Sequence, residues 1–116
     1  MMLPRKIPKS PKRSSRWRSP AHCNFVRGHA CCACGSTAAI EVAHVRIGSG
    51  AGMGQKPDDW NTISLCRDCH INQHRNGEVA FEAFYKFSMA EMARDFAAAS
   101  PKSAEIARIR KEREGG

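Results

Sequence analysis

Long apolar segments are absent from this sequence of 116 residues. No run approaches the roughly 20 residues that a transmembrane helix needs. The opening MMLPRKIPKS lacks the hydrophobic centre of a secretory signal peptide. We therefore expect a cytoplasmic protein with no membrane association. In that compartment, cysteines more often serve as metal ligands or free thiols than as disulfide partners.

Acidic residues are missing from the N-terminal segment. Residues 1–20 carry seven Lys/Arg and no acid, residues 21–99 carry seven basic and eight acidic residues, and residues 100–116 carry five and three. Most of the net charge of +8 therefore lies on a Pro- and Ser-rich arm with too little apolar surface to fold alone. We expect a disordered arm that binds phosphate backbones, with Trp17 as a candidate for stacking on a base. A solvated tail without a ligand is the alternative.

Internal repeats are also absent, and the length leaves room for one domain. We divide the chain into the basic arm (1–20), a folded domain (21–99) and a charged C-terminal tail or helix (100–116). The folded part, roughly 80 residues, is small for a hydrophobic core, so a structural metal is a reasonable source of stability.

Cysteine is the residue type that the sequence does have in an ordered pattern. Four of the six cysteines form two C-x-x-C pairs, one in CCACG and one in LCRDC: Cys31 with Cys34, and Cys66 with Cys69. Each pair can form a knuckle that offers two thiolates, and two knuckles complete a tetrahedral zinc site.

The residues around these pairs support the metal interpretation. Gly35 follows the first pair, where a turn with positive φ is easily formed. Cys23 and Cys32 do not fit the spacing, and we expect packed or free thiols at both positions. A redox role for either pair is disfavoured because no βαβ pattern surrounds them.

Two histidines follow the second cysteine pair. His70 and His74 are four residues apart in RDCHINQHRNG, which predicts a short helix that ends at Asn76-Gly77. On such a helix both imidazoles lie on one face and can hold a second metal ion. Alternatively, one of them replaces a cysteine at the zinc.

The segment between the knuckles predicts a hairpin. The apolar alternation over residues 40–47 favours a strand that contains His44, and TISLC favours a second strand that runs into the second knuckle. Glycines at 48, 50, 52 and 54 mark the loop between them. We therefore predict a small α+β fold in which one zinc ties a two-stranded hairpin to a helix.

One or two further helices are expected towards the C-terminus. Phe81, Phe84 and Tyr85 have helical spacing and are assigned to the core. Ser88 with Glu91 forms a capping box for the next helix.

The combination CCACG, EVAHVR and WNTISLCRDCHINQH, spanning about residues 25–84, resembles the HNH endonucleases of the ββα-metal superfamily in their four-cysteine zinc form. The resemblance places His44 at the first-motif histidine, Asn61 at the middle asparagine and His70 at the final histidine. The segments GMGQKPDDW and FVRGHACCACG are similar in sequence to phage and prophage members of this family, including recombination-enhancement nucleases that act with RecA.

This resemblance implies a catalytic ββα-metal site that cleaves DNA. His44 would be the general base, since an unperturbed histidine pKa of ~6.5 suits neutral pH. His70 would bind a catalytic Mg²⁺ or Mn²⁺, and Asn61 would orient His44 or hold the loop. Many relatives have a metal ligand where this chain has Ala43, so the ion needs another ligand: His74 first, then Asp58, Asp59 or Glu41.

We therefore expect a metal-dependent endonuclease that hydrolyses phosphodiester bonds in DNA, in phage or prophage recombination or DNA processing. A recombinase filament on DNA is a further expected partner. The alternative is a non-catalytic zinc module that binds nucleic acid through the arm, which leaves the three histidines without a role.

Overall fold

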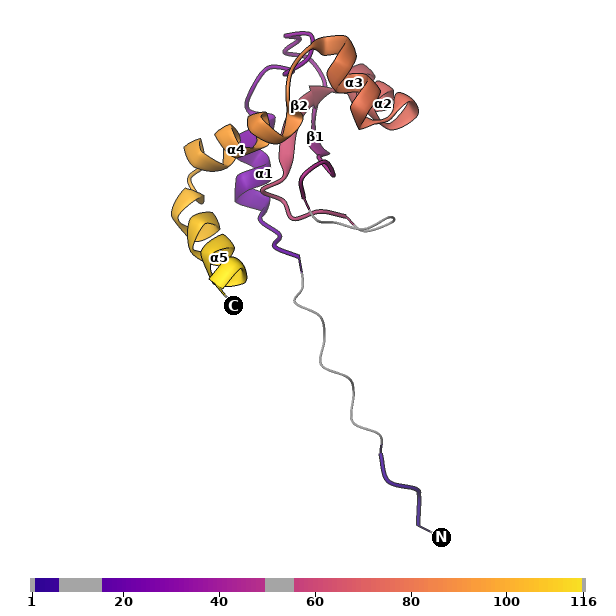
Figure 1. The fold of residues 1–116 in the computed structure, drawn as a ribbon, viewed down its shortest axis with the longest axis vertical. Coiled ribbons are helices and arrows are strands. Elements are labelled where there is room, and N and C mark those ends of the chain that lie inside the picture. The colour runs from indigo at the N-terminus through magenta and orange to yellow at the C-terminus, as the bar shows by residue number, and fades with distance from the viewer. Residues whose placement is uncertain (1, 7–15, 50–55, 116) are drawn as a thin grey trace.

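The computed structural model describes residues 2–6, 16–49 and 56–115 (Figure 1). Half of the predicted disordered arm, residues 1 and 7–15, and the glycines at 50, 52 and 54 lie outside these ranges. The described chain is a small α+β domain with the elements α1 (Pro20–Arg27), β1 (Ile40–His44), β2 (Thr62–Cys66), α2 (Arg67–Asn76), α3 (Glu78–Tyr85), α4 (Met89–Ala99) and α5 (Ser103–Gly115). No helix in the described ranges has the length and apolarity to cross a membrane.

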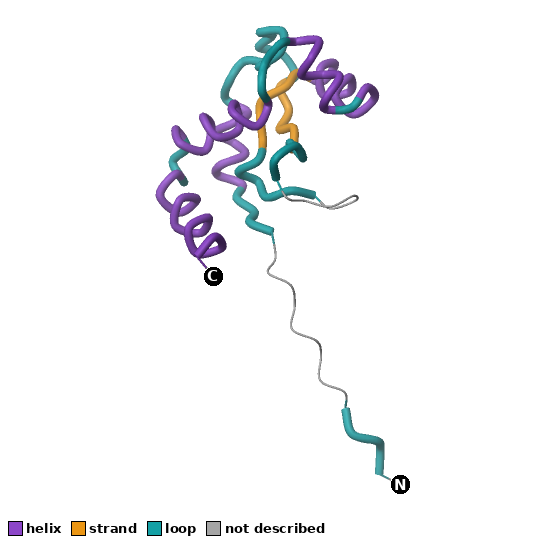
Figure 2. Tube along the Cα trace, viewed as in Figure 1, coloured by secondary structure: helices purple, strands orange, loops and turns teal. Residues whose placement is uncertain are grey.

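The hairpin is the centre of the domain. β1 and β2 pair antiparallel, with Ile40 opposite Cys66 and His44 opposite Thr62. β2 is buried along its whole length, whereas β1 is only partly covered. Helices α1 and α4 contact the hairpin on one side, and α2 leaves directly from the end of β2 to contact both strands (Figures 1 and 2). β2 is therefore the strand around which the helices assemble.

The first strand is shorter than the sequence predicts, ending at His44 rather than near Ile47. One further ladder bond follows, from the Val45 N–H to the Asn61 carbonyl at 2.7 Å. The Glu78 carboxylate then accepts the N–H groups of Arg46 and Ile47 at 3.0–3.2 Å. The strand ends here because the next backbone N–H groups donate to the Glu78 side chain and not to a neighbouring strand.

The main core lies between the hairpin and the helices. Its members are almost fully buried and come from every element except α5: they include Val26, Ala43, Val45, Ile63, Leu65, Phe81, Met89, Ala93 and Phe96. The predicted core assignment of Phe84 is wrong, since its side chain is 77% exposed. Phe81 and Tyr85, four residues apart, face the same way with ring centroids 4.7 Å apart. Phe84 is rotated off this face.

Helix α4 begins where the sequence predicts. The Ser88 hydroxyl accepts the Glu91 N–H at 3.2 Å, as expected of an N-cap. Helix α1 was not predicted, although the same chemistry starts it. Ser19 is its N-cap, accepting the His22 N–H at 3.1 Å, and Pro20 occupies the first turn. The Ser-Pro pair was the available signal.

The folded domain includes residues on the N-terminal side of the predicted boundary at residue 20. Trp17 is only 9% exposed and belongs to a second core cluster with Trp60, Ala97 and Ile106. The two tryptophan rings stack with centroids 5.4 Å apart. Trp17 is therefore a structural residue in the described chain and is not available for stacking on a base. The C-terminal segment is a helix, α5, and Ile106 anchors it to this cluster.

Gly77 separates α2 from α3 with φ +86° and ψ 157°. The helix therefore ends at Asn76-Gly77 as predicted, and this combination of φ and ψ lies outside the left-handed helical region and is essentially restricted to glycine. A Cβ at this position would meet no atom within 4 Å, so any effect of substitution comes from the backbone alone.

We predict that Gly77→Ala lowers the free energy of unfolding by about 1–3 kcal/mol through this backbone strain. Gly77→Asn should be equally destabilising, because asparagine tolerates only the left-handed helical region. Urea unfolding of both variants, with Asn76→Ala as the control, tests this. Full recovery of stability in the asparagine variant would contradict it.

Candidate metal centre and active-site cleft

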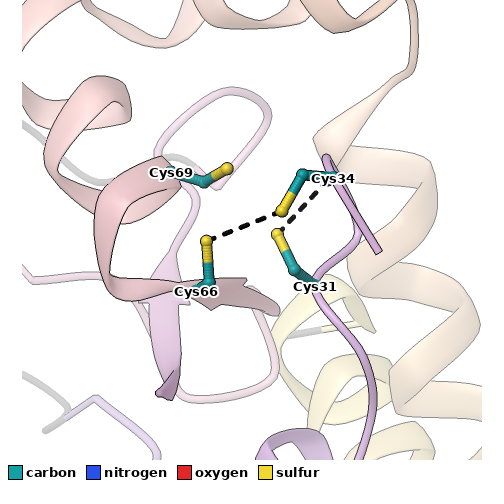
Figure 3. Close-up of side chains that lie close together, drawn as sticks. All are labelled: Cys31, Cys34, Cys66 and Cys69. Carbon is teal, nitrogen blue, oxygen red and sulfur yellow. Dashed lines mark hydrogen bonds between the residues drawn. The ribbon is translucent and has the colours of Figure 1, made fainter. Parts of the chain in front are cut away.

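Four cysteines converge at the base of the hairpin (Figure 3). Cys31 and Cys34 lie in the loop between α1 and β1, Cys66 ends β2, and Cys69 lies in the first turn of α2. Their sulfur atoms all lie within 4.8 Å of one another, and the sulfurs of Cys34 and Cys66 are 3.7 Å apart. A tetrahedral zinc with Zn–S bonds of about 2.3 Å needs sulfur–sulfur separations of about 3.8 Å. The four thiols therefore fit a single structural metal.

The local backbone supports this geometry. Gly35 has φ +79° and donates its N–H to the Cys31 carbonyl at 2.9 Å, which closes the predicted knuckle turn. Burial opposes ionisation of Cys31, but hydrogen bonds from the backbones of Cys66, Cys34 and Ala33 outweigh it and lower the Cys31 pKa to about 7. Burial raises the pKa of Cys69, assisted by the neighbouring Cys66 thiol. A metal binds the thiolate form of cysteine, and the lowered pKa of Cys31 makes this form accessible near neutral pH.

The other two cysteines lie apart from this cluster. Cys32 points its sulfur at the Ser64 hydroxyl, 3.3 Å away, and Cys23 on α1 lines a separate cleft. All six cysteines are free thiols. Within the described ranges the four-cysteine set is the only group of three or more potential ligands that closes this tightly, and it contains no histidine. The alternative with a histidine in place of one cysteine therefore finds no counterpart in the fold.

A cleft of about 930 Å³ opens beside the hairpin, between α1, β1, α2 and the segment before β2. Of the site residues predicted from the sequence, His44, Asp59, His70 and His74 line this cleft, and Asn61 does not. Four cations also line it: Arg18, Arg27, Arg46 and Lys56. The cleft thus combines imidazoles and three carboxylates, those of Glu41, Asp59 and Glu78, with these four cations.

His44 pairs with Asp59 across the cleft floor. Its Nε2 lies 2.9 Å from the Asp59 Oδ1. Burial lowers the pKa of His44, and the nearby carboxylate only partly offsets this. Burial alone would raise the pKa of Asp59, but hydrogen bonds from His44, the Ser19 N–H and Arg18 lower it. At neutral pH the pair is a neutral imidazole against an ionised carboxylate.

The ionisation of Asp59 fixes the tautomer of His44. A carboxylate can only accept, so Nε2 of His44 carries the proton and Nδ1 holds the free lone pair. Both oxygens of Asp59 are engaged, Oδ1 by His44 and Arg18 and Oδ2 by the Ser19 N–H. Asp59 is therefore a hydrogen-bond partner of His44, and its candidate role as a metal ligand stays a prediction.

The two helix histidines face one another. Nε2 of His70 and Nε2 of His74 are 3.2 Å apart, close to the spacing of two ligands on one ion with metal–nitrogen bonds of about 2.1 Å. The Glu41 carboxylate lies 2.9 Å from Nδ1 of His70. A carboxylate behind a ligating histidine fixes its tautomer and aims the other nitrogen at the ion. Glu41 thus contacts Nδ1 of His70 and leaves Nε2 of His70 facing His74, and its candidate role as a metal ligand stays a prediction.

Asn61 lies at the end of the hairpin, on a different and smaller pocket that includes Arg16, Asp58 and Arg113. Its backbone N–H donates to the Asp58 carbonyl at 2.9 Å, and its carbonyl accepts the Val45 N–H. Asn61 thus holds the loop next to His44 through its backbone.

Sequence reasoning missed the donors that hold Asp59. Arg18 and Ser19 reach this carboxylate from 41 and 40 positions away in the chain. No local motif signals such a contact, and both residues were assigned to the disordered arm.

Comparison with known proteins gives a family without an assigned activity. The model of DUF968, described as a protein of unknown function, matches residues 3–100. The chain belongs to the DUF968 family. The match includes all six cysteines and the cleft histidines, and it ends before α5.

One curated relative is the uncharacterized protein YdfU of Escherichia coli K12. It is 37% identical to this chain over 83 residues, which cover 71% of this chain and 23% of YdfU. The chain thus spans less than a quarter of that relative. No solved structure matches the chain.

We predict one zinc per chain, held by the four clustered cysteines. Cys31→Ser should lose the metal and unfold the domain, because small metal-stapled domains depend on the ion for their fold. Elemental analysis and circular dichroism provide the measurements. The neighbouring Cys32→Ser is the matched control and should keep both metal and fold. Well-folded wild-type protein without zinc would overturn this prediction.

Proposed function

We propose that this DUF968 protein is a metal-dependent endonuclease that hydrolyses phosphodiester bonds in DNA, as its resemblance to HNH nucleases implies. The observation that carries the proposal is the arrangement of the cleft. A neutral, oriented His44 and the His70–His74 pair open into the same cationic cavity. Phosphodiester hydrolysis needs an activated water and a cation against the developing charge. Both requirements have candidate residues here.

His44 acts as the general base. Its Nδ1 accepts the proton from the attacking water, while Nε2–H stays bonded to Asp59. The ionised carboxylate then stabilises the imidazolium that forms. The lowered pKa of His44 keeps the imidazole in its basic form at neutral pH.

His70 and His74 are the residues that would hold the catalytic cation, with Glu41 fixing the orientation of His70. When bound, a divalent cation polarises the scissile phosphate and stabilises the departing oxygen. Of Mg²⁺ and Mn²⁺, the imidazole pair favours Mn²⁺, since Mg²⁺ prefers oxygen ligands and retained waters.

The charged wall suits a polyanionic substrate. Arg27, Arg46 and Lys56 line the cleft, and the basic arm adds further cations at the N-terminus. Such contacts give affinity for phosphate backbones without sequence selection. The similarity to phage and prophage nucleases extends the proposal to DNA recombination or processing, with a recombinase filament on DNA as a partner.

His44→Ala should reduce metal-dependent cleavage of supercoiled plasmid by about 10²–10⁴-fold, the usual contribution of a general base. Zinc content and DNA affinity should be unchanged. His29→Ala is the control, because His29 lies outside the cleft, where its Nδ1 contacts the Phe25 carbonyl at 2.8 Å and its ring packs against Phe25 and Phe96. Cleavage by His44→Ala at the wild-type rate would exclude the assignment. If the wild type cuts no form of DNA with any divalent ion, the non-catalytic binding module is the correct reading.

The pH dependence of cleavage should reflect His44. Because burial lowers its pKa, the basic form persists at pH values below the ordinary histidine pKa of about 6.5. Activity should therefore fall only as the pH drops through a midpoint below that value. Initial rates at saturating DNA between pH 5 and pH 8 measure this midpoint. A midpoint above 6.5 would be inconsistent with this role.

The helix histidines should control the requirement for the cation. His70→Ala and His74→Ala should each raise the Mn²⁺ concentration needed for half-maximal cleavage, and excess Mn²⁺ should partly restore activity. Zinc content should not change, because neither residue lies in the cysteine cluster. An unchanged Mn²⁺ requirement in both variants would remove them from the metal site.

Deletion of residues 1–15 should weaken DNA binding and flatten its salt dependence. This segment carries five Lys/Arg, so the slope of log K against log salt should fall by up to about 4. The cut is placed before Trp17 because that residue is part of the folded domain. Binding isotherms between 50 and 300 mM NaCl measure the slope. An unchanged slope would show that the arm makes no phosphate contacts.

A further inference from the structure

We propose that Trp17–Ser19, the root of the basic arm, positions the His44 imidazole by holding the Asp59 carboxylate against it. Arg18 is the principal positioning residue. The inference rests on the proposed function for its kinetic consequences, but its structural part does not depend on cleavage.

The root and the carboxylate are joined by charge-assisted hydrogen bonds. The Ser19 N–H donates to the Asp59 Oδ2 at 2.8 Å, and Arg18 donates to the Asp59 Oδ1 at 3.1 Å. The same Oδ1 faces Nε2 of His44 at 2.9 Å. Asp59 is only 6% exposed, so protein donors and not water must stabilise its charge.

Arg18 also braces the backbone that carries Asp59. Its guanidinium donates to the Pro57 carbonyl and, at 3.2 Å, to the Lys56 carbonyl. One side chain thus bonds three residues of the segment 56–59, namely Lys56, Pro57 and Asp59. Arg18 also lines the cleft, and its side chain is 42% exposed. Removing it takes away contacts but leaves no buried cavity.

The root itself is fixed by main-chain bonds and by packing. The Trp17 N–H donates to the Asp58 Oδ1 at 2.6 Å, and the Trp17 carbonyl accepts the Asp59 N–H at 3.0 Å. The Trp17 ring is stacked on Trp60. These bonds set the register between residues 17–19 and 58–59, and with it the position from which Arg18 and Ser19 reach the carboxylate.

The competing interpretation is that Arg18 is only one more cleft cation that contacts phosphate. Arg27 provides the matched comparison. It lines the same cleft and carries the same charge, but its guanidinium bonds the Asn24 side chain at 2.6 Å and does not touch Asp59. Loss of Arg27 removes a cation alone, whereas loss of Arg18 removes a cation and the brace on Asp59.

The kinetic test compares Arg18→Ala, Arg18→Lys and Arg27→Ala in the full chain, with zinc content and thermal unfolding as controls of the fold. Arg18→Ala should lower kcat at saturating DNA by about 10–100-fold, the effect of a small misplacement of a catalytic group. Arg18→Lys should recover part of this loss, since an ammonium can still bond Asp59. Arg27→Ala should raise KM and leave kcat near the wild-type value. An unchanged kcat in Arg18→Ala would overturn the proposal.

A second measurement is independent of cleavage. ¹⁵N NMR of the His44 ring in metal-free buffer at neutral pH should show the Nε2–H tautomer in the wild type. Arg18→Ala should shift the ring towards a mixture of tautomers, in the direction of Asp59→Asn, whose amide can donate to Nε2. If the protein cleaves no DNA but this shift occurs, the nuclease proposal fails and the positioning role stands. A wild-type tautomer in Arg18→Ala would overturn the positioning role whatever the activity.

Discussion

The convergence of four thiols at the end of β2 is the constraint on which the rest of the structure depends. Cys66 pairs with Ile40 at the end of the hairpin, and Cys69 lies three residues later in the first turn of α2. A metal held there fixes at once the register of the strands and the direction in which the helix leaves them. His70 follows Cys69 directly, so its position on the cleft wall is a consequence of the sulfur geometry. Under the proposed function, the thiolates would hold a structural metal and the neighbouring imidazoles would hold the catalytic one.

A pair of adjacent aspartates organises the opposite end of the molecule. Asp58 is 2% exposed and accepts the Trp17 N–H and the Arg113 guanidinium, while Asp59 accepts donors from Arg18, Ser19 and His44. The first carboxylate joins the arm root to α5, and the second joins the arm root to the cleft. Buried carboxylates with several donors are rigid, because moving any one partner leaves an uncompensated charge.

The parts of the structure that the sequence predicted are those with local signals. The ligand spacing of the knuckles, the capping serine of α4 and the glycine after α2 each follow from residues within a few positions of one another. The order of His44, Asn61 and His70 around the knuckles predicted a shared site. His44 and His70 line the same cleft, whereas Asn61 does not. The signals failed where partners are distant in sequence. The arginines around Trp17 indicate a solvated tail, and only the distant Trp60 shows that Trp17 is buried. The donors to Asp59 likewise lie about forty residues away from it in the chain. Phe84 failed for another reason: helical spacing shows which residues share a face, but not which face the core will cover.

The pairing of Arg113 with Asp58 has a practical consequence for shortening this chain. The DUF968 match ends at residue 100, and a truncation placed there would look safe from the family alignment. It would remove α5, and with it the guanidinium whose Nη1 lies 3.0 Å from both oxygens of Asp58. It would also remove Ile106 from the cluster that contains Trp17 and Trp60, and so expose both indole rings to solvent. A soluble fragment for crystallisation or NMR therefore needs to extend past residue 113.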